Sequence, residues 1–265
     1  MTIAITSRFG FTLDEPATAL LQFEAAALPD QIVTHSACSI TPAEELSRIP
    51  AQDGIGERVW LQGNGTVEVE YEAQVAAHRE EPALDRLAAA PLHLLPGEAV
   101  QYLLDSRYCR ADDFQSLVAS EFAGTQGGAR IAAIEEWIGA NFSYVPGASD
   151  TSTSATESFV KRQGVCRDYA HVLVTLARAS SIPARYVACY APGVTPQDFH
   201  AVAQVYLSNA DATGGAWHLV DPTGMADLGN AAIIGVGRDA ADVSFITSFG
   251  PMRFEHSSVE VALSN

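Results

Sequence analysis

The chain has 265 residues and a formal net charge of −17, and 48% of its residues are hydrophobic. This acidic balance argues against nucleic acid and anionic membrane surfaces as partners, because both require a basic face on the protein. The hydrophobic share is that of an ordinary soluble protein with a sizeable core, and the length predicts one or two domains.

The first residues, MTIAITSRFGFTLDEP, contain no basic segment followed by an apolar run, so they are not typical of a secretory signal. No stretch approaches the roughly 20 apolar residues of a membrane-spanning helix. Together these observations predict a cytoplasmic, reducing location and no membrane partner. The sequence leaves the oligomeric state open.

The front of the chain, up to about residue 78, reads as an antiparallel β unit. The runs ALLQFEAAAL (19–28) and QIVTHSACSI (31–40) are compatible with strands. The stretch ERVWLQGNGTVEVEYEAQV (57–75) has Gly63-Asn64-Gly65 between apolar runs, which predicts a hairpin turn there. After that turn apolar and acidic residues alternate at the period of a strand with one buried face: Val67, Glu68, Val69, Glu70, Tyr71 and Glu72.

Helical patterns follow from Pro82. The stretch GGARIAAIEEWIGANF (127–142) has apolar residues at helical spacing. Ser154 and Glu157 match a capping box, which predicts a short helix toward Arg162. A third helix begins at Cys166 and ends near Pro183, with one apolar face.

The chain then returns to strand patterns. ARYVACY (184–190), HAVAQVYL (200–207) and WHLVDPT (217–223) each predict a strand, and DVSFIT (242–247) and SSVEVAL (257–263) are weaker candidates. Helices followed by an antiparallel sheet, with a separate β unit in front, predict an α+β fold.

The four cysteines are Cys38, Cys109, Cys166 and Cys189. They are far apart and contain no CxxC pair, so neither a disulfide framework nor a structural zinc site is expected. We expect no metal and no cofactor. Two readings of Cys166 then remain: a small apolar residue on its helix face, or a nucleophile.

The position of Cys166 at a predicted helix start favours the nucleophile. The thiolate is the reactive form of cysteine, and the unpaired N–H groups of a helix N-terminus stabilise a negative charge there. The same N–H groups can hold the oxyanion that forms when sulfur attacks a carbonyl. A nucleophile also requires a base and a group that orients the base.

His200 and Asp221 are the candidates for the base and its orienting group. His200 opens one predicted strand and Asp221 closes the next, so antiparallel pairing through residues 209–215 would bring them together. His218 lies three residues before Asp221 and should face the other side of the sheet. His171 is five residues after Cys166, about 500° around the helix, and should point away from the sulfur. The remaining histidines show no second catalytic signal: His35, His78, His93 and His256.

Four sequence blocks around Cys166, His200 and Asp221 resemble a known family. The blocks GVCRDYAH, IPARYV, DFHAVAQVYL and WHLVDPT stand in the order of bacterial transglutaminase-like proteins, within the papain-like thiol enzyme superfamily. YLLDSRYC upstream and VGRDAADV downstream are also similar to that family. The resemblance implies a papain-like transglutaminase core of helices packed on an antiparallel sheet, at 116–265, preceded by an N-terminal β-rich domain at 1–115.

The resemblance also implies roles for individual residues. Cys166 matches the nucleophile, His200 the general base and later general acid, and Asp221 the residue that orients the histidine. The family commonly has Trp two residues after the histidine, whereas this chain has Val202. We expect that difference to alter the pocket wall beside the base and hence the substrate preference.

The residues next to the nucleophile have structural interpretations. Gly164 would permit the turn that delivers Cys166, and Arg167 and Asp168 would anchor the first helical turn. The backbone N–H of Cys166 is favoured over the Gln163 side chain as the donor to an oxyanion.

The leading hypothesis is a thiol enzyme that acts on amide or peptide bonds through a thioester acyl-enzyme and releases product by hydrolysis, with a peptide or protein as substrate. Transamidation of protein glutamine, by a second amine, is the alternative outcome of the same triad. A binding module that kept the fold without activity is the rival from another class. A calcium-dependent cross-linking enzyme is disfavoured, because no Asp-x-Asp-x-Asp-Gly loop occurs.

Overall fold

The computed structural model describes residues 2–42, 45–79, 83–209 and 214–264. The strands are β1 (Thr2–Leu21), β2 (Gln31–Thr41), β3 (Glu45–Pro50), β4 (Glu57–Ala77), β5 (Ser143–Tyr144), β6 (Gln163–Gly164), β7 (Ala184–Tyr190), β8 (His200–Ser208), β9 (Gly215–Val220), β10 (Ala232–Gly237), β11 (Ile246–Ser248) and β12 (Met252–Ser264). The α-helices are α1 (Gly97–Val100), α2 (Gln115–Glu121), α3 (Gly127–Asn141), α4 (Ala155–Lys161) and α5 (Cys166–Ala179). Short 3₁₀ helices connect several of these elements.

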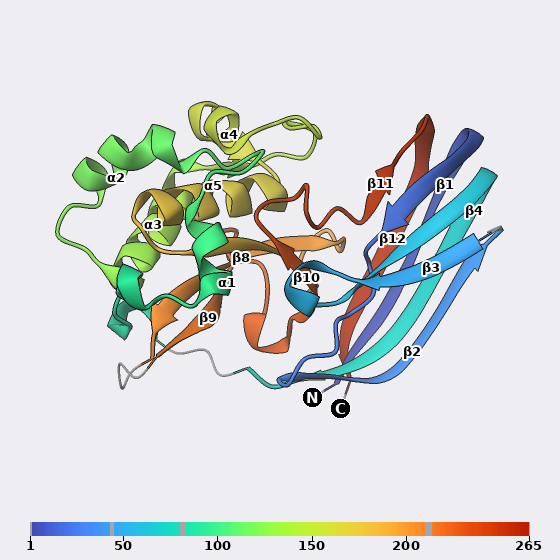
Figure 1. Cartoon of the computed structure of the whole chain (residues 1–265), viewed down its shortest axis with the longest axis horizontal. Helices are drawn as coiled ribbons and strands as arrows, with labels where there is room; N and C mark the ends of the chain where they lie inside the picture. Colours follow the sequence, from blue (N-terminus) through green and yellow to red (C-terminus); the bar gives the residue numbers. More distant parts are fainter. Residues whose placement is uncertain (1, 43–44, 80–82, 210–213, 265) are drawn as a thin grey trace.

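Two antiparallel sheets organise the molecule, and Figure 1 shows them side by side. The first has six strands: β11, β1, β4 and β2 follow one another, β12 pairs with β1, and β3 pairs with β4. The second has four strands in the order β10-β7-β8-β9, and the helices gather around it (Figure 1). The predicted α+β class, with a front β unit and a helix-covered sheet behind it, is confirmed.

The expected hairpin at 63–65 is wrong, because β4 runs without reversal from Glu57 to Ala77. Both halves of β4 pair with the same long strand, with Leu13 opposite Gly65 and Ala17 opposite Gly63. The extra residues lie in β1, between Leu13 and Ala17, where the register shifts. Gly65 takes a φ of 81°, so the Asn-Gly pair adopts the backbone of a local irregularity within a continuous strand.

The C-terminal strand joins the front sheet. β12 pairs with β1 over its length, from Thr2 opposite Ser264 to Leu13 opposite Met252, and both chain ends lie close together in Figure 1. The predicted catalytic core at 116–265 includes this strand. The division after residue 115 stays a prediction, but the strand pairing adds residues 246–264 to the sheet that residues 2–77 begin.

A second core lies between the helices and the four-stranded sheet. Helix α5 presents Leu173 and Leu176 to Val205 and Leu207 of β8, and Ile134 of α3 packs in the same cluster. The apolar face expected of α5 is only part of its buried surface, because every residue from Asp168 to Arg178 is buried, the polar His171 and Thr175 included. None of the helices in the described part of the chain combines the length and apolar character needed to cross a membrane.

The two sheets share buried residues, so they are not independent layers. Tyr190 and Ile234 of the four-stranded sheet belong to the core of the six-stranded sheet. The Tyr190 hydroxyl donates to the carbonyl of Phe23 at 2.6 Å, and the Gln31 amide both donates to and accepts from the backbone of Ile233. These polar contacts fix how the sheets sit relative to each other.

Candidate active site

The start of α5 is held by Asp168. Its buried carboxylate accepts a hydrogen bond from the Val165 N–H at 2.8 Å and another from the Ser149 hydroxyl. A Cβ on Gly164 would lie 2.5 Å from the Cβ of Asp168, so a glycine is needed there to leave room for this anchor. Arg167 adds bonds to the carbonyls of Asp150 and Thr153. The anchoring roles predicted for Arg167 and Asp168 therefore match their contacts.

Cys166 is the first residue of α5, as the sequence predicted, and its side chain is half-buried. The other three thiols have different surroundings. Cys109 and Cys189 are fully buried, and burial raises the pKa of the Cys109 thiol to about 12. Cys38 is an exposed residue of β2, yet partial burial of its thiol, together with Glu24, raises its pKa to about 12. Cys166 is thus the cysteine that combines a helix start with access from a cleft.

His200 and Asp221 meet as the strand pairing predicted. Strands β8 and β9 are antiparallel neighbours, with Ala203 opposite Val220. The His200 Nε2 lies 3.0 Å from Oδ2 of Asp221, and both side chains are buried. The other ring nitrogen, Nδ1, is buried and has no hydrogen-bond partner among the residues that the structure describes. The histidine is therefore held at one nitrogen and available at the other.

The Asp221 carboxylate is itself held by the turn that follows β9. The Thr223 N–H and hydroxyl donate to Oδ1 at 2.9 and 2.7 Å, and the N–H groups of Met225 and Ala226 donate to Oδ2 at 3.1 and 2.8 Å. Burial alone would raise the pKa of Asp221, but the bonds from His200, Thr223 and Ala226 lower it below its ordinary value. Asp221 is thus a fixed anion behind the imidazole.

The His200 ring favours its charged form. Burial alone would lower its pKa, but the bond to Asp221 and the nearby Cys166 sulfur outweigh burial and raise the pKa to about 9. An imidazolium next to a thiol is the electrostatic partner that a thiolate requires. Cys166 and His200 thus form one electrostatic unit with Asp221.

The two residues open into one cleft of about 480 Å³. Cys166 of α5 and His200 of β8 line it on one side, and Phe245, just before β11, and Phe254 of β12 line it on the other. Gln163 is half-buried in β6 and is not among the cleft-lining residues described. The expectation for Val202 is wrong: its side chain is fully buried among Val187, Cys189 and Ile233 and does not form the cleft wall.

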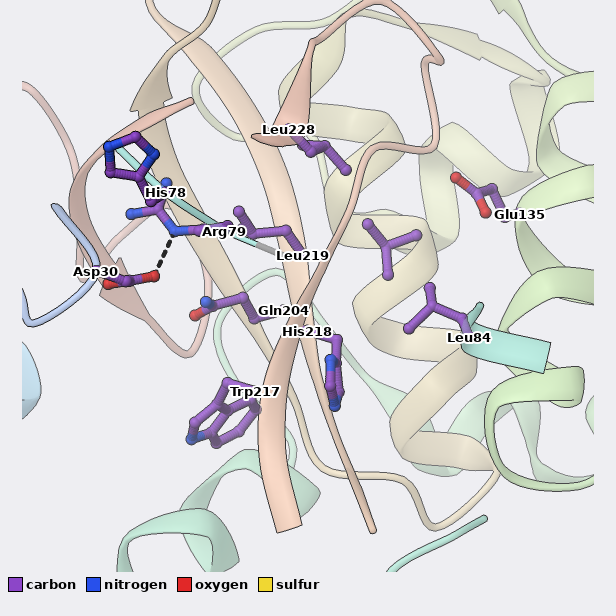
Figure 2. Close-up of a pocket in the computed structure, with 11 residues that line it drawn as sticks. Asp30, His78, Arg79, Leu84, Glu135, Gln204, Trp217, His218, Leu219 and Leu228 are labelled. Atoms are coloured by element: carbon purple, nitrogen blue, oxygen red, sulfur yellow. Dashed lines mark ion pairs between the residues drawn. The ribbon is translucent and has the colours of Figure 1, made fainter. Parts of the chain in front are cut away.

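His171 and His218 lie elsewhere, as the sequence analysis expected. His171 is fully buried in α5, where its Nε2 accepts from the Ala240 N–H at 3.1 Å, and burial holds its pKa well below the ordinary value. His218 points into a separate cavity of about 440 Å³ beside β9, together with Trp217 and Glu135 (Figure 2). That cavity shares no described lining residue with the Cys166 cleft.

Sequence reasoning missed two residues of this site. Tyr144 of β5 pairs with Gly164, two positions before Cys166, and burial together with the Cys166 sulfur raises the pKa of its hydroxyl to about 12. No local pattern in NFSYVPG points to that proximity. Thr223 is the second, and the Asp-Pro-Thr-Gly turn was its available signal, because Asp and Thr in such a turn bond to nearby backbone N–H groups.

Comparison with known proteins also identifies the part of the chain that contains Cys166, His200 and Asp221 as a transglutaminase-like core. The sequence model of the Transglutaminase-like superfamily matches residues 115–222, which include Cys166, His200 and Asp221. A solved structure from Cytophaga hutchinsonii, described as that of a candidate cysteine protease, matches 99% of this chain and 90% of its own, with a TM-score of 0.89 and 32% sequence identity. That likeness extends over both sheets.

Curated relatives match a shorter part. An uncharacterized protein of Mycobacterium leprae is 31% identical over 120 residues, which are 43% of this chain and 42% of that protein. An uncharacterized protein of Mycobacterium tuberculosis is 29% identical over 134 residues, which are 46% of this chain and 42% of that protein. The chain thus spans less than half the length of these two relatives.

Proposed function

The chain belongs to the transglutaminase-like superfamily, and we propose that it is a thiol enzyme that hydrolyses amide or peptide bonds through Cys166, His200 and Asp221. The observation that carries the proposal is the state of His200. Its Nε2 bonds to Asp221 at 3.0 Å, while Nδ1 has no partner among the described residues and belongs to a side chain that lines the Cys166 cleft. A base held in this way is what a nucleophilic thiol needs.

Acylation follows from these positions. In the reactive form the Cys166 proton resides on Nδ1 of His200, so the sulfur is a thiolate, and Asp221 stabilises the imidazolium through Nε2. The thiolate attacks the carbonyl carbon, and the C–N bond breaks as the leaving nitrogen takes the proton from His200. A thioester on Cys166 and a free amine result. The N–H groups at the start of α5 can donate to the oxyanion.

Deacylation decides between hydrolysis and transamidation. In hydrolysis His200 takes a proton from water, the hydroxide attacks the thioester, and carboxylic acid and thiol are released. In transamidation a second amine attacks instead. We favour hydrolysis, which agrees with the candidate protease of Cytophaga hutchinsonii, and no described feature of the cleft marks a place for a second amine.

A labelling experiment tests the proposal against a binding module without activity. Iodoacetamide would be applied over a range of pH values, and the alkylated cysteines identified by peptide mass spectrometry. We expect Cys166 to react fastest at neutral pH, well ahead of free cysteine, which serves as the reference because burial and Glu24 raise the pKa of the Cys38 thiol to about 12. If Cys166 reacts no faster than free cysteine at neutral pH, the thiol-enzyme proposal fails.

The outcome of the reaction requires a second measurement. Peptide and glutamine-containing substrates would be incubated with and without an added primary amine, and the products identified by mass. We expect the hydrolysed acid to be the main product in both cases. If the amine adduct dominates whenever amine is present, transamidation replaces hydrolysis as the assignment.

A further inference from the structure

The cleft at Cys166 has walls from two different sheets. Cys166 and His200 stand on the helix-covered side, whereas Thr247 of β11 and Phe254 and Ser257 of β12 stand on the other. The front sheet therefore supplies a wall for the thiol site, and that wall comes from the last strands of the chain (Figure 1).

The cleft contains an aromatic cluster of three rings. Phe199, the neighbour of His200 in the chain, stacks on Phe245 with ring centroids 5.0 Å apart, and Phe254 meets Phe245 edge-on at 5.7 Å. Phe9, fully buried in the front sheet, contacts Phe199 and Phe245 from behind at 6.2 and 5.7 Å. The cluster is therefore fixed by the core and does not need a ligand to form.

The outer ring of this cluster is exposed. Phe254 keeps 43% of its surface accessible, although large aromatic side chains are usually covered. Of the charged residues that line the cleft, Arg167 is engaged by two backbone carbonyls, whereas Arg107 and Asp198 are exposed and form no ion pair among the described residues. An exposed aromatic ring beside a reactive thiol gains most from an apolar group on the molecule that binds there.

We propose that Phe199, Phe245 and Phe254 form a subsite for an apolar side chain of the peptide substrate, with an aromatic one preferred. The front sheet thereby selects the substrate of the thiol site. This proposal rests on the proposed function, because the occupant is part of the molecule whose carbonyl Cys166 attacks. It also gives the front β unit a role in the reaction.

The test uses the full-length protein and thiol-directed peptidyl vinyl sulfones that carry Phe, Ala or Asp at each position in turn. The measured quantity is the second-order rate constant for inactivation, with covalent attachment at Cys166 checked by mass spectrometry. At one position we expect the Phe probe to react about tenfold faster than the Ala probe, from burial of the ring. Phe254→Ala should remove most of that preference, and Phe254→Leu should keep part of it.

Phe249→Ala is the matched control. Phe249 is also an exposed phenylalanine of the C-terminal segment, 63% accessible, but it packs on Trp60 and lies outside the Cys166 cleft. Its loss should leave the Phe preference unchanged. The iodoacetamide rate at Cys166 is measured for every variant, because that small reagent does not need a subsite.

The outcomes separate the two proposals. A fast Cys166 that reacts equally with Phe and Ala probes, or prefers Asp, overturns the subsite and leaves the thiol enzyme standing. Equal effects of Phe254→Ala and Phe249→Ala overturn the subsite as well. A Cys166 that is slow toward iodoacetamide in the parent overturns the enzyme and the subsite together.

Discussion

His200 uses its two ring nitrogens for two different purposes. Nε2 is fixed by Asp221, which four further hydrogen bonds hold in place, so the ring has little freedom to turn away. Nδ1 is left for proton transfer. The identity of the residue that orients the histidine therefore decides the tautomer of the base, and small changes at that residue should have chemical effects without unfolding the protein.

Replacement of the nucleophile gives the first prediction. Cys166→Ser changes one atom at a half-buried position, so the fold should persist while amide hydrolysis falls by about 10³-fold or more, since a hydroxyl ionises far less readily than a thiol. Initial rates and circular dichroism measure the two effects. Cys189→Ser, in a fully buried strand, is the control and should leave the rate unchanged while costing some stability. Equal activity of the two serine variants would refute the role of Cys166.

The second prediction concerns pH. The His200 pKa is raised from its ordinary value to about 9, so its bound proton stabilises the folded protein fully below pH 6.5, and this contribution is lost as the pH rises through about 9. Activity that depends on the imidazolium should decline over the same alkaline range. Asp221→Asn should move that decline to lower pH and reduce the rate, though less than Cys166→Ser.

The position of the alkaline limb in the rate profile, and the His200 ring signals in an NMR titration, measure this shift. Asp227→Asn is the control, because Asp227 is an exposed carboxylate of the same loop and bonds to Asn230. An alkaline limb that stays in place in Asp221→Asn would show that Asp221 does not set the charge of His200.

At the scale of elements, the start of α5 is the critical junction. A single residue, Val165, separates β6 from the helix, and the Asp168 carboxylate accepts a hydrogen bond from the Val165 N–H. Position 164 requires glycine because any larger residue would bring its Cβ into collision with Asp168, and not because the backbone there has a positive φ. The position of the Cys166 sulfur therefore depends on the close contact between Gly164 and Asp168.

Gly164→Ala tests that junction. The added methyl group would lie 2.5 Å from the Asp168 Cβ, so we expect a loss of about 1–3 kcal/mol in the free energy of unfolding, together with slower alkylation of Cys166. Urea unfolding and the iodoacetamide rate provide the measurements. Gly139→Ala, at an exposed site in α3 with no atom in the way, should instead stabilise the protein by about 0.5–1 kcal/mol. A Gly164→Ala variant as stable and reactive as the parent would contradict the steric argument.

At the scale of the whole molecule, the two sheets share one continuous set of contacts. Tyr190 and Ile234 of one sheet lie in the core of the other, and Gln31 bonds to the backbone of β10. The cleft exists because these contacts hold the aromatic wall opposite Cys166. Separation of the sheets would therefore dismantle the substrate site while leaving the bond between His200 and Asp221 within the second sheet.

This shared core predicts that the sheets unfold together. Urea unfolding followed by fluorescence and by circular dichroism should give coincident transitions. Tyr190→Phe, which removes the 2.6 Å bond to the Phe23 carbonyl, should lower the free energy of unfolding by about 0.5–1.5 kcal/mol and keep a single transition. Two separate transitions in the parent protein would show that the sheets are independent units.

The sequence by itself determined the features that repeat locally. The alternation of residues 67–72, the start of α5 at Cys166 and the capping box at Ser154 are recorded in neighbouring residues, and each matches the structure. The approach of His200 to Asp221 was also within reach, because a short connection between two strands permits one simple pairing.

Only the tertiary structure decided the features that depend on contacts between residues far apart in the chain. The Asn-Gly pair at 64–65 has the local signature of a hairpin, but β4 continues because one long strand pairs with both of its halves. Thr2 meets Ser264, and that pairing brings Phe254 across from Cys166. Val202 is buried in the core and not in the cleft wall, because it packs with Val187, Cys189 and Ile233 from the neighbouring strands of its sheet. Such contacts depend on the free energy of packing residues far apart in the chain, which no local periodicity encodes.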